Sequence, residues 1–146
     1  MRAIHRLFSI MFTSIVLSSI TMPVYADLRQ EVWLNADERE VVLIEMRNFL
    51  KGSQQVLEAS LEEDMVRVSQ TARPLGVKMM KVLPKSLIQK MPVPFAAMFK
   101  TLHYGFEEIA DISQSPNANS KIVLKKLATM QHSCVGCHAT YQLKIK

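Results

Sequence analysis

Residues 121–141 read KIVLKKLATMQHSCVGCHATY and form the most informative stretch of the 146-residue chain. Apolar side chains recur there three and four positions apart, which is the spacing of an amphipathic helix. Both cysteines of the chain lie within this stretch, in the sequence CVGCH at residues 134–138. On a helix, positions i, i+3 and i+4 share a face. We therefore expect Cys134, Cys137 and His138 to project from one side of the last helix.

The spacing C-x-x-C-H is that of the attachment sequence for c-type haem. Two thiols separated by two residues can each add to one vinyl group of the same porphyrin. The histidine that follows them then points toward the iron. The sequence predicts one haem c, covalently bound through Cys134 and Cys137, with its iron bound by His138.

Three other interpretations of the motif were weighed. A structural zinc site needs four ligands, and the chain has no second cysteine pair to complete it. A thioredoxin-like redox pair follows a strand in an α/β pattern, and we expect no strand before residue 134. A disulfide across two residues of a helix is strained and leaves the adjacent histidine unexplained.

The rest of residues 27–146 is predicted to be helical. Asn35 and Asp64 are expected to cap two helices, with Glu38 completing a capping box at the first. Pro74 should kink or split the second helix because it removes a backbone donor. No segment shows sustained period-two alternation, so we expect an all-α protein, an antiparallel four-helix bundle. The apolar faces of the four helices are expected at Val42–Ser60, Met65–Val82, Phe95–Ile112 and Ile122–Tyr141. A short helical turn is expected at Ser86–Met91.

Residues 1–26 have the layout of a secretory signal peptide. A short basic start precedes an apolar run from Leu7 to Ile20, and small residues lead up to Ala26. The run is shorter than the ~20 apolar residues that a membrane-spanning helix needs. We expect cleavage after Ala26, a mature domain of residues 27–146 without a membrane span, and a periplasmic location.

Charge is distributed unevenly along the mature chain. Residues 27–64 carry ten acidic and four basic side chains, whereas residues 65–146 carry three acidic and twelve basic ones. Such a dipolar protein does not have the uniform basic surface of a nucleic-acid binder. We therefore expect no nucleic-acid partner.

A leader, four helices and C-x-x-C-H in the last turns of the final helix together resemble the cytochrome c-prime family. The resemblance covers about residues 35–146 and is most specific at CVGCHATY, residues 134–141. It implies haem at one end of the bundle, with His138 as the proximal iron ligand. Because family members often dimerise through their first two helices, it leaves a homodimer open. Two basic positions of the family are Val42 and Gln142 here, which disfavours diatomic-gas binding.

Met46 is predicted to be the distal, sixth iron ligand. It lies about eleven residues into the first helix and shares an apolar face with Val42 and Phe49. In an antiparallel bundle this part of the first helix lies beside the end of the last. Met46 and His138 could therefore reach one haem from opposite sides. The alternative is that Met46 fills the core and the iron has five ligands.

The predicted function is that of a one-electron carrier that exchanges electrons with redox partner proteins. We expect it not to be an enzyme, because the first helix offers no distal acid–base pair for peroxidase-like chemistry. The alternative function is binding or sensing of NO or CO at a five-coordinate iron.

Overall fold

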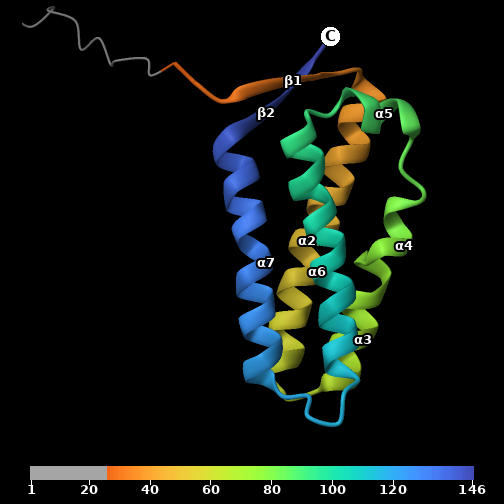
Figure 1. The fold of residues 1–146 in the computed structure, drawn as a ribbon, viewed down its shortest axis with the longest axis vertical. Coiled ribbons are helices and arrows are strands. Elements are labelled where there is room, and N and C mark those ends of the chain that lie inside the picture. The colour runs from red at the N-terminus through yellow and green to blue at the C-terminus, as the bar shows by residue number, and fades with distance from the viewer. Residues whose placement is uncertain (1–25) are drawn as a thin grey trace, which may run out of the picture.

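The computed structural model describes residues 26–146 (Figure 1). The predicted signal peptide, residues 1–26, lies outside the described residues except for Ala26. The described part is mostly helical, as the sequence predicts. In chain order its elements are β1 (Gln30–Leu34), α2 (Ala36–Leu61), α3 (Met65–Ala72), η1 (Arg73–Leu75), α4 (Val77–Met80), α5 (Lys85–Lys90), α6 (Val93–Ser113), α7 (Ser120–Thr140) and β2 (Tyr141–Ile145).

The long helices α2, α6 and α7 lie side by side with the interrupted segment α3–η1–α4 (Figure 1). Consecutive segments run in opposite directions along the long axis of the molecule. The α2–α3 and α6–α7 connections therefore lie at one end, and the two strands lie at the other. Helix α6 packs against both α3 and α7.

The predicted helix caps are confirmed. The Asn35 side chain accepts a hydrogen bond from the Glu38 amide at 2.8 Å, and the Glu38 carboxylate accepts one from the Asn35 amide at 3.0 Å. Asp64 accepts from the Arg67 amide at 2.9 Å and begins α3. Each cap satisfies amides that have no partner inside the helix.

The predicted break at Pro74 is also confirmed. Helix α3 ends at Ala72, and Pro74 lies in the 3-10 turn η1. Arg73 beside it forms ion pairs with Glu107 at 2.5 Å and with Asp111 at 2.7 Å, both on α6. The second oxygen of Glu107 accepts from the Val77 amide at 3.0 Å, where α4 begins. Helix α6 thus holds both sides of the break.

The expectation that the mature chain contains only helices is wrong at its two ends. Strand β1 pairs in parallel with β2, with Gln30 opposite Tyr141 and Leu34 opposite Ile145. Val32 and Leu34 are buried under the pair. Polar and apolar residues alternate in β2, which reads YQLKI, but not in β1, which reads QEVWL. Each segment has only five residues, and so short a segment becomes a strand only when a partner strand is available.

Fully buried side chains from four segments meet at the end of the molecule opposite the strands, which we call the closed end. They come from α2, α3, α6 and α7. The fully buried residues there are Val56, Ala59, Val68, Ile109, Ala110 and Val123. Within residues 26–146, no helix combines the length and the apolar composition that a membrane crossing requires.

Candidate functional site

A cavity of about 570 Å³ lies between α2, α6 and α7, in the half of the molecule nearer the strands. We call it the main cavity. Its volume falls within the range of about 300–1,000 Å³ that is typical of small-molecule and cofactor sites. Most of its lining is apolar, and the apolar side chains are Leu43, Phe49, Leu50, Phe99, Leu102 and Val135.

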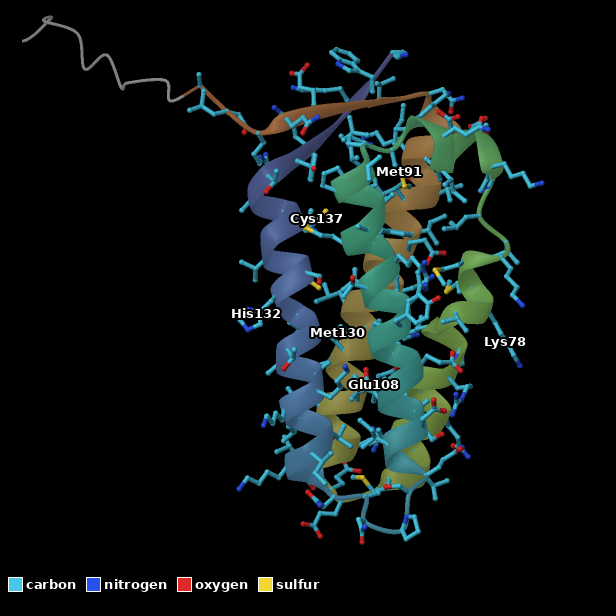
Figure 2. All side chains as sticks on the ribbon, in the orientation of Figure 1. Lys78, Met91, Glu108, Met130, His132 and Cys137 are labelled. Carbon is cyan, nitrogen blue, oxygen red and sulfur yellow. The ribbon has the colours of Figure 1, made fainter. Side chains whose placement is uncertain are left out.

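All four residues predicted to bind haem or its iron line the main cavity. Met46 enters from α2, and Cys134, Cys137 and His138 enter from α7. Cys137 is buried and points from α7 toward α6 (Figure 2), whereas Cys134 is half-buried and His138 is exposed. The helical spacing of the motif therefore brings its two thiols and its imidazole to one face, opposite a thioether from another helix.

The main cavity opens to solvent between α2 and α7. Leu50 is 74% exposed and Val135 is 69% exposed, although both line the cavity. Arg47, also in the lining, extends outward and forms an ion pair with Glu40 at 2.8 Å. A planar group in the cavity would keep one edge close to solvent.

A second cavity of about 320 Å³ adjoins the first and extends toward the strands. We call it the arginine cavity, because Arg29 and Arg39 are both in its lining. It shares Leu43, Met46, Cys137 and His138 with the main cavity. The two cavities together form an apolar space with a positively charged end.

The two cysteines are free thiols and form no disulfide with each other. Burial raises the pKa of both thiols, and the neighbouring Cys134 adds to the effect at Cys137. Both side chains are therefore protonated at neutral pH. Among the described residues, no group of three or more histidine, cysteine, aspartate or glutamate side chains is arranged to hold a metal ion.

Glu45 is a buried carboxylate next to Met46 on α2. It is 6% exposed, and its Oε2 atom has no hydrogen-bond partner among the described residues. Burial raises its pKa. It lies outside the lining of both cavities.

His103 on α6 is fully buried. Its Nδ1 atom lies 2.9 Å from the Leu75 carbonyl oxygen, and its ring meets Phe49 and Phe99 edge-on at 4.9 Å and 5.3 Å between centroids. Burial lowers its pKa. His132, by contrast, is exposed and projects from the outer side of α7 (Figure 2).

The sequence interpretation missed Arg29 and Arg39. Arg39 precedes Met46 by seven residues, about two helical turns, so its place on the same side of α2 follows from periodicity. Arg29 reaches the cavity only because β1 pairs with β2, and the residues that it meets are more than a hundred positions away. Local pattern contains no signal for such a contact.

Comparison of the chain with protein-family models, with curated proteins and with solved structures gave no match.

Proposed function

We propose that this chain is an exported c-type cytochrome that carries one covalently bound haem and acts as a one-electron carrier. Residues 27–146 would be its mature domain, a four-helix bundle of the cytochrome c-prime type, released in the periplasm after cleavage at Ala26. The observation that carries the proposal is that Cys134, Cys137, His138 and Met46 line a single apolar cavity.

The thiols suit covalent attachment. In thioether formation, the thiol sulfur bonds to one vinyl carbon and the thiol hydrogen goes to the other, so nothing is lost. Cys134 and Cys137 are free, protonated and directed to the same cavity. Two adjacent vinyl groups of one porphyrin match two thiols one helical turn apart.

The polar residues suit the other parts of a haem. Its two propionates need positive partners, and Arg39 lines the arginine cavity. Arg29, the other arginine of that lining, already pairs with Asp27. Arginine binds carboxylates well because its donors form a rigid fork. The apolar lining of the main cavity matches the porphyrin plane.

His138 and Met46 would hold the iron, because they enter the main cavity from different helices. With histidine and methionine as ligands, haem iron would supply a reversible one-electron couple of raised potential. The solvent opening at Leu50 and Val135 would let a redox partner protein approach the haem edge. Electron transfer needs such an edge and no separate substrate site.

The test is to produce the full chain in a bacterium that attaches haem to exported proteins, and to extract the product with acid–acetone. Covalent haem stays with the polypeptide, and we expect the colour to do so. A variant with both Cys134→Ser and Cys137→Ser is the matched control and should release its haem into the organic phase. Release of the haem from the wild-type chain would contradict the proposal.

The visible spectrum of the reduced protein then separates the two functions. Sharp, split bands indicate six-coordinate low-spin iron and support the electron carrier. A broad band that shifts at once with carbon monoxide indicates five-coordinate iron. That result would replace the carrier with the gas-binding alternative while leaving haem attachment intact.

A further inference from the structure

The parallel strand pair brings the start of the described chain to the end of α7. Strand β2 begins at Tyr141, three residues after His138, and Tyr141 pairs with Gln30. Arg29 therefore lies where the backbone leaves α7. The Gln142 side-chain amide donates to the Arg29 carbonyl oxygen at 3.3 Å and adds a further connection.

Arg29 donates to the backbone of the His138 segment. Its Nη1 atom lies 3.3 Å from the His138 carbonyl oxygen and 3.5 Å from the Tyr141 carbonyl oxygen. Carbonyls in the last turn of a helix have no partner inside the helix, and positive charge is favourable at this end of the helix dipole. The contact therefore stabilises the last turn of α7.

Asp27 fixes the direction of the Arg29 guanidinium. The Asp27 carboxylate accepts from Nε at 3.0 Å and 3.1 Å and from Nη2 at 2.6 Å. This leaves Nη1 directed at the carbonyls of α7. Hydrogen bonds from Arg29 lower the pKa of Asp27 to about 2, so both partners stay charged at neutral pH.

Arg29 also lines the arginine cavity, of which the His138 side chain is another wall. One side chain thus contacts the backbone of His138 and borders the space that its imidazole faces. Groups that hydrogen-bond around a metal ligand commonly fix its orientation and tune the metal.

We propose that Arg29, held by Asp27 and the β1–β2 pair, is a positioning residue for His138. It fixes the backbone from which the imidazole projects, and so the angle at which the imidazole meets the iron. The inference rests on the proposed function, since it requires haem at Cys134 and Cys137.

The experiment compares Arg29→Gln with two other variants of the haem-loaded protein. Arg29→Lys keeps the charge and one donor and should restore function. Arg67→Gln is the matched control, because Arg67 is equally exposed at 40% and also pairs with carboxylates, but lies on α3. The readouts are the reduction potential and the fraction of high-spin iron in the visible spectrum. Circular dichroism checks that each variant folds.

We expect Arg29→Gln to lower the potential, because a positive charge is lost, and to add a high-spin fraction, because His138 is held less firmly. Arg29→Lys should recover most of both, and Arg67→Gln should match the wild type. A lower potential without any high-spin fraction would show that Arg29 acts only through its positive charge, and would overturn the positioning role. Unchanged potential and spectrum would overturn it too.

If Arg29→Gln does not fold, Asp27→Asn gives the answer. Asp27→Asn weakens the hold on the Arg29 guanidinium but keeps the guanidinium charge. We therefore expect a high-spin fraction above that of the wild type and below that expected for complete loss of the Arg29 contact. A wild-type spectrum in Asp27→Asn would then overturn the inference. Absence of covalent haem from the wild-type chain would instead defeat the proposed function, so the two failures are distinguishable.

Discussion

The closed end and the cavity end of this molecule are built from the same helices but packed in different ways. At the closed end, side chains such as Val56, Val68 and Ile109 have no exposed surface. At the cavity end, α2, α6 and α7 enclose about 570 Å³, and Leu50 lies 74% exposed at the rim of this cavity. The same helices thus pack together completely at one end and leave an internal space at the other. Substitutions at the two ends should therefore have different consequences.

The largest difference is expected between Ile109→Ala and Leu50→Ala, which each truncate one aliphatic side chain. Ile109 is fully buried, so its loss should lower the free energy of unfolding by about 2–5 kcal/mol. Leu50 is mostly exposed, and its loss should change that energy by less than about 0.5 kcal/mol. Urea unfolding followed by circular dichroism measures both. Equal effects would contradict the division into two ends.

Gly105→Ala tests the boundary between the two ends, where α6 meets α7. A Cβ atom at Gly105 would lie 2.5 Å from Met130 Cγ and 2.6 Å from its Sδ (Met130 is labelled in Figure 2). Overpacking of this kind should lower the free energy of unfolding by about 1–3 kcal/mol. Adding Met130→Ala removes the two clashing atoms. The double variant should then cost less than the sum of the single ones, and strict additivity would refute the clash.

His103 should make stability depend on pH. Burial lowers its pKa, so below the ordinary histidine value of about 6.5 the unfolded chain binds a proton that the folded chain does not. Its contribution is complete above pH 6.5 and is lost as the pH falls toward the lower, folded-state pKa. The loss is at most about 1.4 kcal/mol per pH unit. Urea unfolding at pH 7 and pH 5 measures it.

The variant His103→Gln should flatten this pH dependence. His132→Gln is the control, because His132 is exposed, and it should keep the wild-type dependence. A wild-type slope in His103→Gln would show that other groups cause it.

Met46→Ala is expected to have a small effect on folding and a clear effect on the site. Met46 is half-buried beside existing cavities, so its loss should cost about 1 kcal/mol or less. In the haem-loaded protein, the low-spin bands and the weak near-infrared sulfur–iron band should vanish. Met65→Ala, at a half-buried methionine of α3, should keep both. If the bands persist in Met46→Ala, another side chain binds the iron.

Much of the helical structure could be predicted from local sequence because its determinants are local. Asn35 with Glu38, Asp64 and Pro74 act within a few residues, and each has the predicted effect. The convergence of Cys134, Cys137 and His138 on one face follows from helical periodicity alone.

The remaining features depend on contacts between distant segments. The strand pair forms only when residues 30–34 and 141–145 meet, and neither five-residue segment is long enough to predict a strand by itself. The role of Arg29 at the end of α7 follows from that pair. The cavities are the space left between facing helices. The volume of that space cannot be predicted from the sequence of a single helix.

The strand pair also decides what the only tryptophan of the chain can report. Trp33 lies within β1, opposite Lys144, and is 46% exposed. Its fluorescence should therefore respond to the pairing of residues 30–34 with residues 141–145 and to the packing of β1 on α2 and α5. Because these partners are more than a hundred positions apart, the loop between them is costly to close, and helices are expected to form sooner. A folding curve recorded by tryptophan emission alone would describe this end of the molecule, and would not report how α6 packs against α3 and α7.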